Sequence, residues 1–370
     1  MTLVQNQNWF ELEGNKFTLP DLVNSKNHFT EGSIAHYVMD FVHKWKKGYS
    51  EFEQKSSGST GVPKIQVIKS SQMLASAKAT INTLGLAAGD TALLNINPEF
   101  IGGKMMIVRA LVQSMNLIVK EATGNPLVNL DSERSVDFFS FVPYQLSKIL
   151  TETPEKIKQL NGAKAIILGG APVSNTLAAQ IQQQISAPVF STYGMTETVS
   201  HVALKRLNHG TNTTFKALNN IAFSQDKRNC LIIHAEHITG VPELLTNDVV
   251  KLYDNQHFDW FGRYDFVINS GGIKIHPEQV EEQINSLMNE NNLSFQFFVF
   301  SRLHEQLGSC LCLLLEDNGI DKEELMGKLK SKLPAYHVPK EVYTTTEFQM
   351  TSSGKIDRLN TLRIAGINFN

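Results

Sequence analysis

Alternating apolar and polar stretches in the first third of the chain predict strands and helices that follow one another. The run KIQVI at 64–68 places Ile65 and Val67 on one face, as in a strand. The next run, 70–86, has serines that can cap a helix and carries Gly85 near its end. Two further apolar runs, 92–96 and 114–120, flank a helix-like segment at 102–113. We therefore predict a β-α-β unit in this region.

A second β-α-β unit follows with a clearer pattern. The strand AIIL at Ala165 to Leu168 precedes a GGAP turn, a helix through 174–185 and a strand that ends at Tyr193. Ligands usually bind at loops that follow the carboxyl ends of strands in such sheets, so these turns are candidate binding segments.

The last third changes character and predicts a small α+β domain. A helix beginning at Pro277 precedes two strands joined by a polar turn at 295–317, and an amphipathic helix follows at 321–334. We expect a domain boundary after Arg263, which divides the chain into 1–263 and 264–370.

Composition and charge favour a small-molecule role. The 370 residues are 42% hydrophobic and 19% charged, enough apolar mass for more than one domain. The net charge of -2 argues against nucleic acid or an anionic membrane as the main partner. Neither a signal peptide nor an apolar run of membrane-spanning length is visible, so we expect a cytoplasmic protein. The cysteines, Cys230, Cys310 and Cys312, are expected to serve as small core residues.

The stretch SSGSTGVPK at 56–64 has the composition of a phosphate-binding loop. It is not a Walker loop, because Val62 and Pro63 separate Gly61 from Lys64 and a strand-like run follows. Glycines nevertheless let backbone N–H groups close around an anion, and hydroxyl groups add donors. The candidate phosphate ligands are Ser57, Gly58, Ser59, Thr60, Gly61 and Lys64. A surface turn is the alternative.

Five motifs in the same order resemble those of the adenylate-forming superfamily, which contains acyl-CoA synthetases, peptide-synthetase adenylation domains and luciferases. The phosphate loop is the first; the others are LGGAP at 168–172, STYGMTET at 191–198, Asp248 with GRYDFVINSGGIKIHPEQVE at 262–281, and TSSGKIDR at 351–358. The resemblance implies an α/β protein with a large N-terminal domain of mixed sheets and a small C-terminal α+β domain.

The resemblance also implies a reaction with ATP, Mg²⁺ and coenzyme A. A carboxylic acid attacks the α-phosphorus of ATP, pyrophosphate leaves, and a thiol then displaces AMP from the acyl-adenylate. The implied adenine and nucleotide contacts are Gly169, Gly170, Ala171, Thr192, Tyr193 and Gly194. The implied catalytic residues are Lys355, Thr196 and Arg263, with Asp248 on the ribose and Glu197 on Mg²⁺. A solvated surface lysine and a turn aspartate are the alternatives for Lys355 and Asp248.

Two half-reactions in one site need a movement between them, because the lysine occupies space that the thiol must cross. The resemblance places the hinge at Asp265. Gly271 and Gly272 would then enter the site and leave room for the pantetheine arm, although a β-turn is the simpler interpretation.

Within the superfamily, the motif sequences YGMTETVSH, INSGGIKIHPE and FVPYQL are most similar to those of the o-succinylbenzoate:CoA ligases of menaquinone biosynthesis. Their substrate carries a second carboxylate, which needs a cationic or hydrogen-bonding partner. Lys104, Arg109 and His201 are the candidates. Arg109 could instead extend from a buried helix face, and His201 could be a core histidine. Another aryl- or fatty-acid:CoA ligase and a non-catalytic nucleotide-binding regulator stay open as alternatives.

The sequence departs from the superfamily at several places, including Phe266 where a second acid usually follows the hinge and Lys274 two positions after the paired glycines. Only 55 residues precede the phosphate loop, so a homo-oligomer partner covering the exposed sheet is one expectation, and a compact active variant is the other. The usual Thr-Gly-Asp is Thr246-Asn247-Asp248, which is acceptable if Asn247 adopts positive φ as glycine does.

Overall fold

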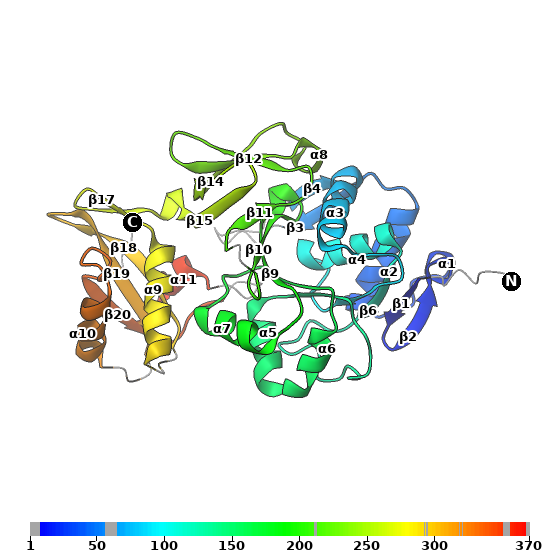
Figure 1. The fold of residues 1–370 in the computed structure, drawn as a ribbon, viewed down its shortest axis with the longest axis horizontal. Coiled ribbons are helices and arrows are strands. Elements are labelled where there is room, and N and C mark those ends of the chain that lie inside the picture. Colours follow the sequence, from blue (N-terminus) through cyan, green and yellow to red (C-terminus); the bar gives the residue numbers. More distant parts are fainter. Residues whose placement is uncertain are drawn as a thin grey trace.

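The computed structural model describes residues 8–55, 65–210, 213–291, 293, 295–317, 319, 321–350 and 356–367. It contains a large sheet, a smaller second sheet and a separate two-stranded hairpin (Figure 1).

The large sheet joins thirteen strands in the order β12-β13-β14-β15-β11-β10-β9-β8-β7-β5-β6-β1-β2. Their bounds are β1 Trp9–Leu12, β2 Asn15–Thr18, β5 Thr91–Leu94, β6 Asn116–Val119, β7 Phe138–Phe141, β8 Ala165–Leu168, β9 Val189–Gly194, β10 His201–Arg206, β11 Phe215–Ala217, β12 Ala222–Gln225, β13 Cys230–His234, β14 Leu244–Leu252 and β15 His257–Arg263. The neighbours from β1 through β6, β5, β7 and β8 to β9 run parallel, and the other pairs are antiparallel.

Helices cover both faces of the parallel strands, and side chains on each strand alternate between two cores. Ile167 of β8 contributes to one core and Ile166 to the other. The first core receives α2 (Ile34–Lys46), α3 (Ser70–Leu84) and α4 (Ile101–Gln113), and the second receives α5 (Pro143–Glu152), α6 (Ile157–Asn161) and α7 (Asn175–Gln184). Burial on both faces explains why β8 is apolar throughout.

The structure confirms both predicted β-α-β units, because β5 pairs in parallel with β6 and β8 with β9. Helix α3 ends as expected at Gly85, which has a left-handed φ of 65°. The remaining elements of this part were not foreseen: the helices α1 (Leu19–Asn24), α2, α5, η1 (Pro154–Lys156), α6, η2 (Thr196–Thr198), α8 (Glu236–Thr239) and η3 (Tyr264–Phe266), and the strands β1, β2, β3 (Glu51–Lys55), β7 and those from β10 to β15.

The hairpin of β3 (Glu51–Lys55) and β4 (Ile65–Lys69) stands apart from both sheets. Its strands pair antiparallel, with Phe52 opposite Ile68. These two side chains are buried in the first core. The hairpin therefore fixes the positions at which the chain enters and leaves residues 56–64.

The smaller sheet contains β16 (Ile268–Ser270), β17 (Ile273–Ile275), β18 (Phe297–His304), β19 (Gly308–Glu316) and β20 (Glu341–Thr345). Helices α9 (Pro277–Glu290), α10 (Lys322–Lys332) and α11 (Arg358–Ile364) accompany it. The α+β character predicted for the last third is confirmed. All three cysteines are free and buried, and Cys310 and Cys312 belong to an apolar cluster of this sheet, as expected.

Helix α9 lies on the side of the smaller sheet that faces the larger part of the molecule (Figure 1). Its Glu278 accepts a hydrogen bond from the backbone N–H of Arg263 at 3.4 Å through Oε1, while Oε2 is buried without a partner. Asn175 of α7 donates to Ser286 of α9. Glu281, one turn after Glu278, pairs with Arg358 at 2.8 Å. The start of α9 thus contacts both the end of the large sheet and the start of α11.

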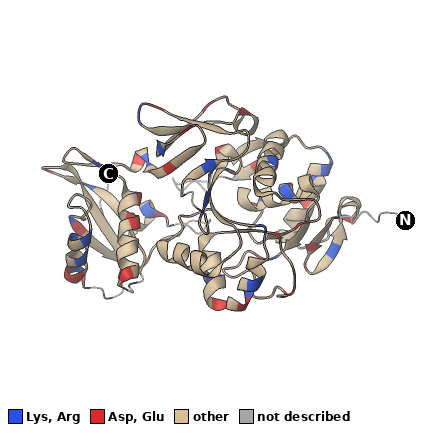
Figure 2. Cartoon of the chain, viewed as in Figure 1, with Lys and Arg blue, Asp and Glu red and all other residues tan. Residues whose placement is uncertain are grey.

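Acidic and basic residues are interspersed along the helices and strands (Figure 2). No large region of a single sign is drawn, in keeping with the net charge of -2. Within the described ranges, none of the helices has both the length and the apolar character needed to cross a bilayer.

The adjacent glycines Gly102 and Gly103 of α4 provide a matched test of this packing. A Cβ on Gly103 would lie 2.7 Å from the carbonyl oxygen of Asn97, whereas the nearest atom to one on Gly102 is 4.0 Å away. Because backbone cannot yield cheaply, Gly103→Ala should lower the free energy of unfolding by at least about 1–3 kcal/mol. Gly102→Ala should raise it by about 0.5–1 kcal/mol through helix propensity. Urea unfolding measures both, and equal effects of the two variants would contradict the packing.

Glu278 predicts a pH dependence of stability. Burial raises the pKa of its carboxyl above the ordinary value. The folded protein then holds this proton to higher pH than the unfolded chain does, so the stability that the group contributes is lost as pH rises through the raised pKa. Glu278→Gln removes the ionisation, and its stability relative to the wild type should therefore increase over that pH range in urea unfolding.

Glu152→Gln is the control of opposite sign. A hydrogen bond from Lys148 lowers the pKa of Glu152, so this carboxylate contributes stability that is lost as pH falls through the lowered pKa. The relative stability of Glu152→Gln should decrease as pH rises across the carboxylate range. A pH-independent difference between Glu278→Gln and the wild type would show that Glu278 does not titrate abnormally.

Candidate functional site

Asp248 occupies the centre of a hydrogen-bonded group between three strands of the large sheet. It lies on β14 directly opposite Arg263 of β15. The hydroxyl of Tyr193, at the end of β9, donates to Oδ2 at 2.7 Å, and the indole N–H of Trp260 donates to Oδ1 at 3.1 Å. Burial, followed by the charge of Asp248, raises the pKa of Tyr193 well above its usual value, so Tyr193 stays a donor. Each carboxylate oxygen retains a lone pair for a ligand hydroxyl.

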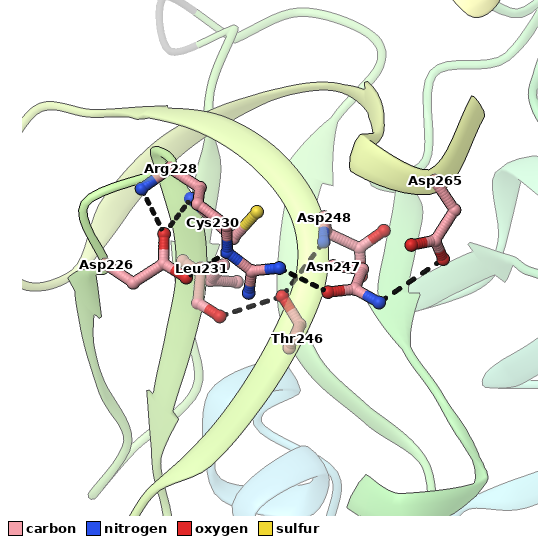
Figure 3. Close-up of polar contacts among 8 residues, drawn as sticks. All are labelled: Asp226, Arg228, Cys230, Leu231, Thr246, Asn247, Asp248 and Asp265. Carbon is pink, nitrogen blue, oxygen red and sulfur yellow. Dashed lines mark hydrogen bonds and ion pairs between the residues drawn. The ribbon is translucent and has the colours of Figure 1, made fainter. Parts of the chain in front are cut away.

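Thr246 and Asn247 hold the strand that carries Asp248 (Figure 3). The Thr246 hydroxyl donates to the carbonyl of Leu231 at 2.8 Å and accepts from the N–H of Asp248 at 3.1 Å. Asn247 accepts from Arg228 at 3.1 Å and donates to Asp265 at 3.3 Å.

The expectation that Asn247 adopts positive φ is wrong. It lies within β14, and it is absent from the described non-glycine residues with positive φ. Its side chain instead links two loops. The alternative of a turn position for Asp248 is likewise excluded, because Asp248 pairs within a strand.

The turn after β9 carries Thr196 and Glu197 in the short helix η2, Thr196–Thr198. Glu197 is exposed, and its Oε1 accepts a 3.4 Å hydrogen bond from the side chain of Gln66 on β4. Residues 131 positions apart in the sequence therefore meet. The hairpin that flanks residues 56–64 lies against this turn.

The turn after β8 lies beside β9. The N–H of Gly169 donates to the carbonyl of Phe141 at 3.0 Å, and Thr192 donates to the carbonyl of Leu168 at 3.0 Å. Gly170 and Ala171 follow and are exposed. The two turns after β8 and β9 thus lie at the same edge of the sheet, as parallel strands require.

Several predicted site residues lie outside the described residues. They are Ser57, Gly58, Ser59, Thr60, Gly61 and Lys64 of the loop, and Lys355 near the C-terminus. Described neighbours flank Lys355, because Met350 bridges Ile356 and Arg358 pairs with Glu281 at 2.8 Å. The roles of these seven residues stay predictions.

The hinge candidate Asp265 is directly engaged by Arg263, whose Nη2 lies 2.6 Å from its Oδ2. Gly271 and Gly272 form the two-residue turn of the β16–β17 hairpin, where Ser270 faces Ile273. Both have positive φ, 59° and 86°, as a type I′ turn requires. The β-turn interpretation is therefore correct, and entry of these glycines into the site stays a prediction.

The three candidates for the acid do not lie together. Arg109 and His201 are both buried, at 2% and 6% exposure, and share the hydroxyl of Ser200 as a neighbour, at 2.9 Å from Arg109 and 3.4 Å from His201. Lys104 instead donates to the carbonyl of Glu53 at 2.7 Å. Burial lowers the pKa of Lys104 to about 8.

Lys104 lines a cavity of about 370 Å³ between α2, the β3–β4 hairpin and the start of α4. Its volume suits a small ligand. Four carboxylates line it, from Asp40, Glu51, Glu53 and Glu99, against the lysines Lys44 and Lys104. Because this lining repels anions, it gives no support to a dicarboxylate there, and the role of Lys104 stays a prediction.

The residues present fit a nucleotide with one Mg²⁺ ion. Mg²⁺ is commonly bound by one or two carboxylates together with phosphates and water. Glu197 provides an exposed carboxylate beside the hairpin. Asp248 provides an acceptor that is already oriented from both sides.

Sequence reasoning missed Trp260, Gln66 and Glu278. Trp260 stands two positions after the buried Phe258 on β15, yet a tryptophan in an alternating strand usually indicates packing. Nothing local distinguishes Gln66 or Glu278 from surface residues. Their partners lie on elements that no sequence pattern pairs with them.

Comparison with known proteins adds independent evidence. The family model for AMP-binding enzymes matches residues 54–220. Proteins named 2-succinylbenzoate--CoA ligase from Listeria monocytogenes and Enterococcus faecalis are 22% and 26% identical; the matches cover 92% and 83% of this chain and 76% and 70% of theirs.

Solved structures share the fold. The o-succinylbenzoate coenzyme A synthetase of Bacillus subtilis, in complex with ATP and magnesium ion, is 19% identical with a TM-score of 0.71, covering 84% of this chain and 69% of that one. An acyl-CoA synthetase (AMP-forming)/AMP-acid ligase II-like protein from Dyadobacter fermentans is 36% identical with a TM-score of 0.62. That match covers 94% of this chain and 98% of the other. The predicted fold class is confirmed, and the chain belongs to the family of AMP-binding enzymes that includes the AMP-forming acyl-CoA synthetases.

Proposed function

We propose that the protein is an ATP-dependent acid:thiol ligase that converts o-succinylbenzoate to o-succinylbenzoyl-CoA through an acyl-adenylate. The geometry that carries the proposal is the meeting of Asp248, the Thr196–Glu197 turn and the β3–β4 hairpin at one edge of the sheet. The choice of acid is supported by curated relatives that bear this activity in their names.

In the proposed first step, Asp248 accepts hydrogen bonds from the ribose hydroxyls while Tyr193 and Trp260 hold its carboxylate in place. Gly169, Gly170, Ala171, Thr192 and Gly194 border the adenine side. The loop at 56–64 holds the phosphates that leave as pyrophosphate. Bound to Glu197, Mg²⁺ would neutralise phosphate charge.

Negative charge builds up between the attacking carboxylate and the α-phosphoryl group during this step. We assign its stabilisation to the ammonium group of Lys355, with Thr196 as a hydrogen-bond donor and Arg263 near the nucleotide. Rotation of the C-terminal domain, 264–370, about Asp265 would then remove the lysine and open a path for coenzyme A.

The contacts between the two parts suit such a rotation. Arg263 and Asn247 both bind Asp265 through exposed, polar contacts, which exchange with water at little cost. Glu278 leaves one buried oxygen without a partner, so this contact is weaker than a fully satisfied one. The cytoplasmic location and homo-oligomeric state expected from the sequence stay part of the proposal.

Incubation with ATP, Mg²⁺, o-succinylbenzoate and coenzyme A should yield AMP, pyrophosphate and an acyl-CoA in equal amounts. The measurement is pyrophosphate release together with product mass. Turnover of another aryl or fatty acid but not of o-succinylbenzoate would refute the substrate assignment. Nucleotide binding without turnover of any acid would favour a non-catalytic regulator instead.

Lys355→Ala should separate the two half-reactions. We expect a loss of about 10²–10³-fold in adenylate formation, because one preorganised charge at a developing anion has this effect. The loss should be smaller when preformed acyl-adenylate is supplied with coenzyme A, since the lysine would have left the site. ATP–pyrophosphate exchange and single-turnover thioester formation measure the two steps.

Lys330→Ala is the matched control, because Lys330 is an exposed lysine near the end of α10. It should leave both half-reactions unchanged. Unaltered adenylate formation in a folded Lys355→Ala variant would remove Lys355 from the mechanism.

A further inference from the structure

Arg109 is a buried cation with no carboxylate partner among the described residues. Only 2% of its surface is exposed, and burial lowers its pKa to about 10, so it is still charged at neutral pH. Its Nη2 donates to the hydroxyl of Ser200 at 2.9 Å, and its Nε is buried without a partner. Burying a charged group without an ionic partner costs free energy, so the position of Arg109 requires an interaction that explains it.

Ser200 belongs to the turn that carries Thr196 and Glu197. Val199, which directly precedes Ser200, is 1% exposed and has φ 63° and ψ −47°. A β-branched residue rarely adopts positive φ, and such a conformation persists only where the surroundings determine it. The turn is therefore not a shape that the local sequence prefers.

Contacts within the turn provide part of the restraint. The Thr198 hydroxyl accepts from the N–H of Met195 at 2.9 Å and donates to the carbonyl of Ser200 at 2.6 Å. Gly194 approaches β10 so closely that a Cβ would lie 2.9 Å from the backbone nitrogen of His201. The Ser200 side chain bonds outside the turn, to Arg109 of α4.

Helix α4 contacts Ser200 through Arg109, and helix α3 contacts the neighbouring His201 of β10 through Thr80. The imidazole Nε2 of His201 lies 3.1 Å from the hydroxyl of Thr80, and its Nδ1 lies 3.4 Å from that of Ser200. Burial and then the charge of Arg109 lower the pKa of His201 well below its usual value. The imidazole is neutral, so the guanidinium is the charged donor to Ser200.

We propose that Arg109 is a positioning residue that holds the Thr196–Ser200 turn in its strained shape through Ser200. The assignment rests on the proposed function only for what the turn does, namely present Thr196 and Glu197 to the nucleotide. It differs from the sequence-based expectation that Arg109 binds the acid's second carboxylate.

Amide hydrogen exchange tests the structural half without any activity. The N–H groups of Val199 and Ser200 are bonded to the carbonyls of Thr196 and Thr198 at 2.9 and 2.6 Å. In Arg109→Met and in Ser200→Ala, these amides should exchange at least about tenfold faster than in the wild type, because the turn opens locally. Unchanged exchange in Ser200→Ala would overturn the proposal even if Arg109→Met failed to fold.

Kinetics test the functional half. Arg109→Met should slow ATP–pyrophosphate exchange by about 10–100-fold, the scale for small displacements of catalytic groups. The loss should appear in kcat, to the same extent with o-succinylbenzoate and with a turned-over acid lacking the second carboxylate. Arg109→Lys should recover part of the rate. A rise in KM confined to the dicarboxylate would instead identify Arg109 as a substrate ligand and overturn the positioning role.

Arg134→Met is the matched control. Arg134 pairs with Glu11 at the far side of the sheet, donating through Nη1 at 2.7 Å. Loss of this ion pair should lower the free energy of unfolding. It should leave the amide exchange of Val199 and Ser200 and the rate of ATP–pyrophosphate exchange unchanged. A wild type inactive with every acid would refute the proposed function, whereas the hydrogen-exchange result would still decide the role of Arg109.

Discussion

The parallel pairing of six neighbouring strands is the constraint from which the site follows. Parallel strands need crossover connections, and their carboxyl ends all lie at one edge of the sheet. The GGAP turn after β8 and the Thr196–Ser200 turn after β9 are therefore neighbours. The antiparallel strands β14 and β15 then place Asp248 beside Tyr193. An exposed, polar site is thus built upon a core that is buried on both faces.

Neighbouring side chains hold the candidate site residues in place. Asp248 receives one hydrogen bond on each oxygen, from Tyr193 and Trp260. In the Thr196–Ser200 turn, the hydroxyl of Ser200 accepts a hydrogen bond from Arg109, and the hydroxyl of Thr198 donates to the carbonyl of Ser200. Preorganised groups cost little reorganisation during reaction, so rigid support of this kind is what charge stabilisation requires.

The connection between the two parts of the molecule is different in kind. The contacts at Arg263, Asp265 and Glu278 are polar: the Arg263–Asp265 ion pair is exposed, and Glu278 leaves one buried oxygen without a partner. Their replacement by water is inexpensive compared with disruption of an apolar interface. The hydrogen bonds around Asp248 and the polar contacts at α9 are therefore in keeping with the proposed rotation of the C-terminal domain.

The sequence by itself determined both β-α-β units, the α+β character of the last third and the family, because periodicity and residue order are local properties. It also named Asp248, Glu197 and the GGAP turn as site candidates, and their roles stay predictions. Only the tertiary structure decided that Asn247 is extended, that Arg109 reaches Ser200 across 91 residues, and that Glu278 meets Arg263. These contacts depend on strand register and helix placement, which the free energy of the whole core sets and which no local pattern encodes.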